Sequence, residues 1–250
     1  MEVSLFERLI KFGVPSVMLA EQHRMRPEVA RLIVPSIYKK LVNHESVFNY
    51  PTVPSVSRSV FFLNHCNPEE KEKGASSFYN TYEVEMSLRL ADFLCRQGVD
   101  EEKITILVTY GAQKEKMLSH KLYNLFSGPI HVTTVDNYQG QENDIIILSL
   151  VRNNQNGVVG FLRTPNRICV ALSRARHGLF IFGNIEILSG SDKQKFNKGR
   201  KGKKQKNKKS SLWVHVKKVL SQNNELGNEI ILRCDRHPQQ IVKVSVISKL

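Results

Sequence analysis

Short apolar runs alternate with helical patterns along most of this chain, and no other feature constrains the fold as strongly. The runs are Val60–Leu63, Ile104–Val108, Ile130–Val135, Asp144–Val151 and Leu179–Phe182. Each has the length of a buried strand and is bounded by polar residues. Strands that alternate with helices form parallel βαβ units, whose sheet is covered on both faces. The sequence therefore predicts an α/β fold in which helices flank a parallel sheet.

Helical spacing fills the segments between these runs. Apolar residues recur at helical intervals over 82–93, and a second helix is predicted to begin after Gly111 and to run through Leu122. A third helical pattern covers Pro27–Tyr38. Pro35 is expected to kink or end that helix, because proline has no N–H and its ring collides with the preceding turn.

A lysine-rich segment divides the chain. Lys193–Lys209 contains ten basic residues and no acidic one, which leaves 27 basic and 23 acidic residues elsewhere and explains most of the net charge of +14. A block of like charges cannot bury apolar surface, so residues 191–210 are expected to form a disordered linker. The sequence leaves three roles open for it: a solvated linker, a non-specific phosphate-binding segment or a nuclear-import signal. It separates an α/β domain over 1–190 from a small C-terminal extension over 211–250.

The cysteines and the hydropathy pattern indicate where such a chain resides. Cys66, Cys95, Cys169 and Cys234 are never closer than 29 positions, which fits neither a disulfide framework nor a full zinc site. Cys234 and His237 have the spacing of half a zinc site, but no second pair accompanies them, so no metal site is predicted. No apolar run approaches the roughly 20 residues that span a bilayer. We expect an intracellular, cytoplasmic or nuclear protein without a membrane partner.

Ligands in an open parallel sheet bind outside the carboxyl ends of the strands, in the loops that follow them. This rule selects three polar stretches that contain or adjoin glycines: Thr109–Lys116, Thr134–Asp144 and Arg167–Gly178. Two of them are rich in residues that bind phosphate. These stretches are therefore the candidates for a ligand site.

Four motifs carry a family resemblance. They are EQHRMRPE (Glu21–Glu28), VTYGAQKEK (Val108–Lys116), TTVDNYQGQENDIIILSLVR (Thr133–Arg152) and NRICVALSRARHGLFIFGN (Asn166–Asn184). Their content and order resemble the second RecA-like domain of superfamily 1 helicases of the Upf type, most closely the NFX-type zinc-finger helicases. The resemblance covers residues 1–190 and implies a RecA-like, P-loop-NTPase-like parallel sheet that has no P-loop of its own.

The resemblance also implies a nucleotide-facing site. Arg174 is similar to the arginine finger of the family, and Arg24 to a second arginine that reaches the same phosphate, for which a guanidinium offers a planar fork. The implied nucleotide-binding residues are Gln22, His23, Gly140 and Glu142. His23 stands where the family commonly has an aromatic residue stacked on adenine, and its packing at a helix start is an equal alternative. Glu142 resembles the acid that binds the ribose.

A second set of residues resembles those that contact single-stranded RNA or DNA. The set consists of Thr109, Tyr110, Gln113, Thr133, Thr134, Asn137 and Gln139. Hydroxyl and amide groups suit contacts with phosphate oxygens, which position a nucleic acid without reading its sequence. Ordinary hydrogen bonding at strand ends is a competing role for each of these residues taken singly.

A P-loop is missing from this sequence. None of the fourteen glycines begins the pattern G-x-x-x-x-G-K-[ST], which holds the β- and γ-phosphates of ATP and its Mg²⁺. We therefore expect the C-terminal motor half of an ATP-dependent helicase, inactive alone, that shares ATP and Mg²⁺ with a P-loop RecA-like domain in cis or in trans. The alternative is a non-catalytic, stand-alone protein that binds nucleic acid or a helicase partner. Arg24, Glu142 and Arg174, all present, favour the first.

Overall fold

The computed structural model describes residues 4–72, 74, 76–128, 130–190, 211–234 and 237–244. The α-helices are α1 (Leu5–Lys11), α2 (Pro27–Ala30), α3 (Thr81–Arg96), α4 (Gly111–Leu118), α5 (Pro165–Leu172), α6 (Ile185–Ser189) and α8 (Ser211–Gln222). The β-strands are β1 (Glu21–Gln22), β2 (Val42–Asn43), β3 (Val60–Asn64), β4 (Ile104–Val108), β5 (His131–Thr134), β6 (Asn143–Ser149), β7 (Ala175–Gly183), β8 (Leu226–Gly227), β9 (Ile230–Cys234) and β10 (His237–Val244). Short 3₁₀ helices are η1 (Glu45–Val47), η2 (Glu101–Lys103), η3 (Lys121–Leu125), η4 (Asp136–Tyr138) and η5 (Gly160–Arg163). The linker expected over 191–210 lies outside the described residues.

A six-stranded sheet forms the centre of the molecule, in the order β5-β4-β6-β7-β3-β8, and every pairing in it is parallel. The five strands predicted from the sequence are β3 to β7, so the predicted α/β fold is confirmed. Because all strands run the same way, their amino ends lie along one edge of the sheet and their carboxyl ends along the opposite edge. We call these the amino edge and the carboxyl edge.

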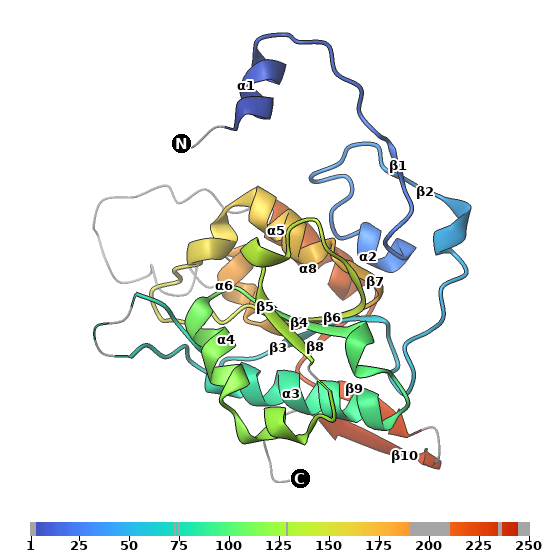
Figure 1. Cartoon of the computed structure of the whole chain (residues 1–250), viewed down its shortest axis with the longest axis vertical. Coiled ribbons are helices and arrows are strands. Elements are labelled where there is room, and N and C mark those ends of the chain that lie inside the picture. Colours follow the sequence, from blue (N-terminus) through green and yellow to red (C-terminus); the bar gives the residue numbers. More distant parts are fainter. Residues whose placement is uncertain are drawn as a thin grey trace.

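Helices cover both faces of this sheet, as Figure 1 shows, with α3 and α4 on one side and α5, α6 and α8 on the other. Strand β6 illustrates why. Ile145 and Ile147 belong to the core cluster that includes α3 and α4, whereas Ile146 and Leu148 belong to the cluster that includes α5 and α8. Successive side chains of a strand point to opposite faces, so an uninterrupted apolar run fits a strand buried on both sides.

Two predicted helices are shorter in the structure. The helix expected over 27–38 is regular only in α2, and residues 31–37 continue as turns, since Pro35 cannot donate the hydrogen bond that would continue the helix. The helix expected to run through Leu122 ends with α4 at Leu118. There the Ser119 hydroxyl donates to the carbonyl of Glu115 at 2.9 Å, and the chain restarts as η3.

The sequence left open whether residues 211–250 form a unit of their own. In the structure, Trp213 of α8 is fully buried in the main core, and its Nε1 donates to the carbonyl of Leu162 at 3.1 Å. Strand β8 extends the main sheet beside β3, and β9 and β10 pair antiparallel. The described part of this extension through β8 therefore packs on the sheet of the preceding domain. Among the described residues, no helix has the length and apolar character needed to cross a bilayer.

Candidate functional site

Three residues distant in sequence meet at the amino edge. Glu142 directly precedes β6 and Arg174 directly precedes β7, and these strands are neighbours in the sheet. Arg24 follows β1 and is brought to the same edge, where its Nη1 donates to the carbonyl of Ser173 at 3.3 Å. The backbone N–H of Arg26 donates to the carbonyl of Arg176 at 3.0 Å and anchors this segment. The fold therefore assembles the two predicted phosphate-facing arginines and the predicted ribose acid in one cluster.

Ion pairs neutralise only part of this cluster. Nε of Arg24 donates to a carboxylate oxygen of Glu142. The same carboxylate lies 3.9 Å from Arg176, which also lies 3.6 Å from Asp144. Both Arg24 and Glu142 are roughly one-third exposed, at 31% and 40% of their side chains. With Arg174 included, three guanidinium groups therefore face two carboxylates at a surface that solvent and a ligand can reach.

Arg174 is held by neutral acceptors. Its Nε donates to the carbonyl of Val170 at 3.0 Å, one Nη donates to the carbonyl of Gln141 at 3.1 Å, and the other donates to the Ser173 hydroxyl at 3.1 Å. Partial burial, and then the positive charge of Arg24, lower the pKa of Arg174. A lowered arginine pKa means that the surroundings disfavour the cation, so a bound anion would stabilise it. The guanidinium is oriented but not neutralised.

This location corrects one sequence-based expectation. Function was predicted at the carboxyl ends of the strands, yet Arg167–Gly178 includes α5 and the start of β7 and places Arg174 at the amino edge. The stretch Thr134–Asp144 begins at the carboxyl end of β5 and returns to the amino end of β6. Thr109–Lys116 follows the carboxyl end of β4 directly. The rule concerns loops that follow strands, whereas these arginine and glutamate side chains stand on segments that precede strands.

Gln22 and Gly140 shape the backbone of the site. The buried Gln22 amide donates to the carbonyl of Met25 at 2.6 Å and accepts from the N–H groups of Arg24 and Met25 at 3.0 and 2.7 Å. Gly140 has a φ of +87°, a conformation that L side chains rarely adopt, and an added Cβ would meet no atom within 4 Å. The structure thus gives Gln22 the role of fixing the turn that carries Arg24, and Gly140 that of permitting the turn before Glu142.

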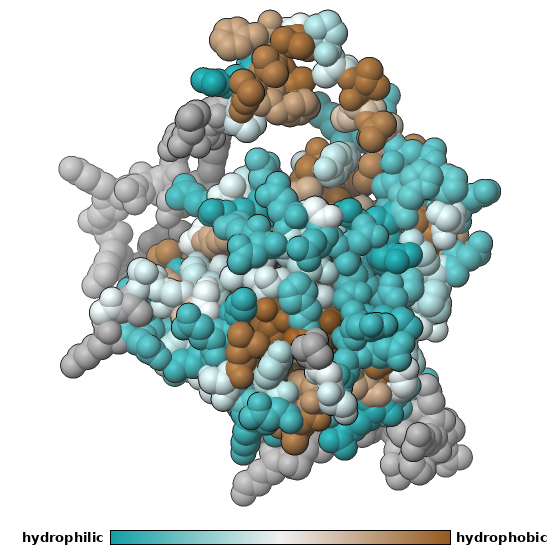
Figure 2. Space-filling model, viewed as in Figure 1, coloured by the Kyte–Doolittle hydropathy of each residue, from teal (hydrophilic) through white to brown (hydrophobic). Residues whose placement is uncertain are grey.

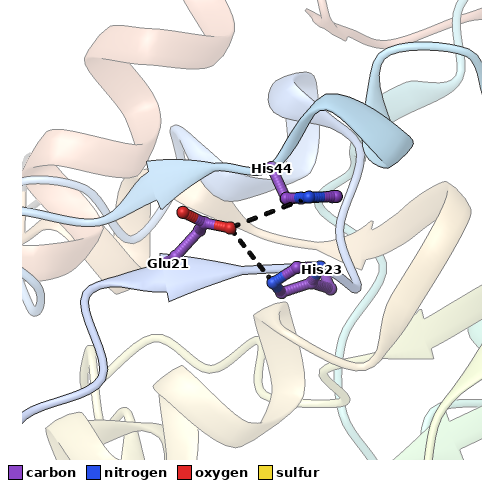
Figure 3. A group of neighbouring side chains, drawn as sticks. All are labelled: Glu21, His23 and His44. Atoms are coloured by element: carbon purple, nitrogen blue, oxygen red, sulfur yellow. Dashed lines mark ion pairs between the residues drawn. The ribbon is translucent and has the colours of Figure 1, made fainter.

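His23 is exposed and stacks on a second histidine. The rings of His23 and His44 lie 4.0 Å apart at 30°, and Glu21 approaches their Nε2 atoms at 3.2 and 3.9 Å (Figure 3). Within the described residues, these three side chains could together supply metal ligands. However, Nδ1 of His44 accepts from the N–H of Ser46 at 3.2 Å, which leaves the proton on Nε2, the atom that would have to bind a metal. The geometry fits a hydrogen-bonded group with an exposed imidazole face.

A different polar cluster lies inside the carboxyl edge. Glu83 of α3 is fully buried, and its carboxylate accepts from the Ser149 hydroxyl at 2.5 Å, the Val151 N–H at 2.9 Å and the ring of His65 at 3.1 Å. Nδ1 of His65 accepts from a backbone N–H, so its Nε2 carries the proton that Glu83 receives. Hydrogen bonds to the charged form stabilise a buried carboxylate. This cluster is satisfied within the protein.

Two predicted nucleic-acid contacts belong to this interior. Gln113 is fully buried; its amide accepts from the Asn80 N–H at 2.7 Å and donates to the Ser149 hydroxyl at 2.9 Å. Thr109 is 4% exposed and donates to the carbonyl of Leu150 at 3.0 Å. Direct side-chain contact with a nucleic acid would require these bonds to break. The structure assigns both residues to the positioning of the loops around them.

The other predicted nucleic-acid residues differ in access. The hydroxyl of Tyr110 accepts from Arg152 and from the Phe161 N–H, each at 3.2 Å, and Tyr110 is half-buried. Thr133 is 5% exposed, whereas Thr134 is half-buried. Asn137 and Gln139 are exposed. The accessible members of the predicted set therefore lie on the segment 134–139, which runs from the carboxyl edge towards Glu142.

Sequence reasoning missed Glu83 and Arg26. Glu83 shares a helical face with Ser87, Leu90 and Leu94, so its spacing on α3 signals burial, although glutamate is rarely buried without partners. Arg26 is 8% exposed and donates to the carbonyl of His177 at 2.7 Å. No sequence signal marks Arg26 apart from its position two residues after Arg24.

Comparison with known proteins gives a consistent result. A family model described as an AAA domain matches residues 1–186. NFX1-type zinc finger-containing protein 1 from Mus musculus is 43% identical over 248 residues, which are 99% of this chain and 12% of that protein. Helicase required for RNAi-mediated heterochromatin assembly 1 from Schizosaccharomyces pombe is 43% identical over 196 residues, 77% of this chain and 19% of that protein. RNA helicase aquarius from Mus musculus is 37% identical over 199 residues, 75% of this chain and 13% of that protein. The chain spans less than a fifth of the length of each of these relatives.

Proposed function

This chain belongs to the AAA domain family, as a RecA-like domain of the Upf1-type superfamily 1 helicases, and from this premise we propose that it is the C-terminal motor half of an ATP-dependent helicase. A P-loop RecA-like domain, in cis or in trans, would bind the β- and γ-phosphates together with Mg²⁺. This chain would close the nucleotide site from the opposite side. Its amino edge would face the triphosphate.

The observation that carries this proposal is the partly neutralised arginine cluster. Arg174 is oriented by three neutral acceptors, while Arg24 is paired with Glu142 at an exposed surface. In phosphoryl transfer, negative charge spreads over the γ-phosphoryl oxygens, and a guanidinium supplied from a neighbouring domain stabilises it. Burial, and then the positive charge of Arg24, lower the pKa of Arg174, and a bound triphosphate would counter both by stabilising the cation. We assign Arg174 the role of arginine finger and Arg24 that of a second phosphate ligand.

Glu142 and His23 have supporting roles in this proposal. Glu142 would accept from the ribose hydroxyls while one of its oxygens still holds Arg24. The exposed imidazole of His23 would stack on the base, with His44 as a backing ring on its other face. Imidazole offers less stacking area than a tyrosine side chain, so base stacking would be weaker than with tyrosine.

The nucleic-acid partner is proposed to be single-stranded RNA or DNA. The names of two relatives, a helicase required for heterochromatin assembly and an RNA helicase, support this class of partner. The exposed amides of Asn137 and Gln139 lie on the segment that ends at Glu142. A nucleic acid bound along 134–139 would therefore act on the same backbone segment that positions the nucleotide-facing carboxylate.

The test is nucleic-acid-stimulated ATP hydrolysis by this chain joined to a P-loop domain. Arg174→Ala is expected to lower turnover by about 10³-fold or more, because arginine fingers contribute this much to the rate. Arg96→Ala serves as the matched control, since Arg96 is exposed on α3 and pairs with Asp92; its turnover is expected within about twofold of the wild type. Undiminished hydrolysis by Arg174→Ala would refute the proposed finger. Robust hydrolysis by the isolated chain would refute the half-motor.

A further inference from the structure

The segment 4–20 is exposed along its entire length. It consists of α1 and an extended run that leads into β1, and α1 has no buried residue. Figure 1 shows α1 standing away from the sheet at the end of this run, and Figure 2 shows the same region as a group of brown, apolar residues apart from the body. A contiguous exposed apolar segment of this kind is typical of an interaction surface.

Helix α1 is amphipathic. Leu5 and Leu9, like Phe6 and Ile10, are spaced four residues apart on one side and are 41–71% exposed. The polar side carries Glu7 and Lys11, which form an ion pair at 2.7 Å. A helix of seven residues is too short to persist alone in water, so packing of its apolar side must supply its stability. We call this side the apolar stripe.

The extended run after α1 has the character of a buried strand. Val17, Met18 and Leu19 are 93%, 67% and 87% exposed. Consecutive apolar residues are typical of strands covered on both faces in parallel sheets. The strand-like run and the stripe are continuous in sequence, so one partner can cover both.

The position of this segment indicates its partner. The AAA domain match begins at residue 1, so the segment belongs to the AAA domain rather than to a separate tail. Arg24 is five positions after Leu19, and an extended chain over that interval spans at most about 17 Å. Whatever covers Leu19 therefore lies beside the arginine cluster of the amino edge.

We infer that segment 4–20 is the docking segment for the P-loop domain, which covers the apolar stripe of α1 and the run Val17–Leu19. This inference rests on the proposed function, which requires that domain to grip a nucleotide next to Arg24 and Arg174. One domain would then both cover the apolar segment and bind the nucleotide next to Arg24 and Arg174. A second copy of this chain fits less well, because it would bring two arginine clusters and two chains of net charge +14 together.

The test measures assembly without nucleotide. The full 250-residue chain is titrated calorimetrically with a separately expressed P-loop domain from one of the longer relatives, recognised by its G-x-x-x-x-G-K-[ST] motif. The double variant Phe6→Glu/Ile10→Glu places two negative charges on the stripe. It is expected to raise Kd by about 100-fold or more. A tenfold rise in Kd corresponds to about 1.4 kcal/mol, which is less than the free energy gained by burying one such side chain.

The matched control is Arg8→Glu, which changes the net charge by the same amount on the polar side of α1. It is expected to leave Kd within about threefold of the wild type. Both variants should keep the urea midpoint of the wild type, because all three side chains are exposed. Equal binding by the double variant, or an equal loss in the control, would overturn the inference. So would a wild-type chain that dimerises through the stripe and does not bind the P-loop domain.

The two proposals can fail separately. Arg174→Ala should bind the P-loop domain like the wild type in this titration, because Arg174 lies outside segment 4–20. Docking that needs the stripe, together with hydrolysis indifferent to Arg174, would leave the inference standing and remove the finger. Loss of hydrolysis in Arg174→Ala together with unimpaired docking of the double variant would support the arginine finger and refute the docking segment.

Discussion

The two edges of the sheet hold polar clusters of opposite character. At the carboxyl edge, the single carboxylate of Glu83 is fully buried and receives three hydrogen bonds from the protein. At the amino edge, Arg174 is oriented by neutral acceptors, while the neighbouring Arg24 and Arg176 share the carboxylates of Glu142 and Asp144. A cluster that satisfies its own charge stabilises the fold. A cluster left with surplus charge at the surface is suited to a ligand that brings the missing charge.

The comparison also separates residues that resemble one another in sequence. Gln113 and Gln139 are both neutral amides predicted to contact nucleic acid. The structure buries the first between α3 and β6 and leaves the second exposed on the segment before Glu142. Burial and hydrogen-bond partners therefore distinguish a positioning residue from a candidate contact where residue type does not.

The largest expected effect is on stability, from Glu83→Ala. The substitution leaves the Val151 N–H and the His65 ring without an acceptor in a buried site, so the free energy of unfolding should fall by about 3–5 kcal/mol. Urea unfolding measures this. Glu85→Ala on the same helix is the control, because Glu85 forms an i,i+4 pair with Arg89, and it should cost less than about 1 kcal/mol. Equal losses in the two variants would contradict the self-satisfied cluster.

Two glutamine variants should change different properties, one the stability of the fold and the other the affinity for nucleic acid. Gln113→Ala leaves the buried Asn80 N–H without its acceptor and should lower the free energy of unfolding by about 2–3 kcal/mol, with little effect on nucleic-acid affinity of the folded chain. Gln139→Ala should preserve stability and weaken single-stranded RNA binding by about 2- to 10-fold, the worth of one hydrogen bond. Urea unfolding and fluorescence anisotropy measure the two quantities. The opposite pattern would exchange the roles assigned to the two glutamines.

At the amino edge, a polyanion should stabilise the isolated chain. Inorganic triphosphate at ten times its Kd adds about 1.4 kcal/mol to the free energy of unfolding, which corresponds to a rise in Tm of about 3–5 °C for a chain of this size. Arg174→Met should abolish most of this shift and, without ligand, remain within about 1 kcal/mol of the wild type. Arg96→Met should keep the full shift. A shift that survives in Arg174→Met would mean that the anion binds elsewhere.

Most of the fold could be predicted from the sequence because its signals are local. The apolar run of β6 fits only a strand covered on both faces, and Pro35 marks the end of its helical segment. The length of α4 could not be predicted, since the apolar spacing continues through Leu122 while the hydroxyl of Ser119 and the ring of His120 end one helix and begin η3. Periodicity records which residues face the core; it does not record local hydrogen bonds that interrupt a helix.

The candidate site was predictable in membership but not in location. The motifs selected Arg24, Glu142 and Arg174, and the structure brings them together. Their placement at the amino edge depends on strand order, because Glu142 and Arg174 become neighbours only when β6 pairs with β7. The burial of Gln113 likewise depends on α3 lying over β6. Long-range pairings of this kind leave no trace in local spacing.

The smallest expected effect is a pH dependence from His177, which lies near the start of β7 with the ring of Tyr50 tilted against its own, 4.6 Å away at 53°. Burial lowers the pKa of His177 below its ordinary value; Asp144, 3.7 Å away, acts in the opposite direction, and Arg176, Arg26 and Lys103 reinforce the lowering. The positive charges of the amino edge thus add to the effect of burial on this histidine. Because the unfolded chain binds the proton more readily, the folded state should lose stability as pH falls below about 6.5.

His177→Gln removes this titration, so its free energy of unfolding should fall less between pH 7.5 and 5.5 than that of the wild type. Urea unfolding at a series of pH values measures the difference, with His131→Gln, at an exposed position of β5, expected to follow the wild type. If attraction to Asp144 dominated instead, the wild type would gain stability relative to His177→Gln on acidification. The sign of one slope therefore decides whether burial, reinforced by the neighbouring positive charges, or attraction to the Asp144 carboxylate prevails at His177.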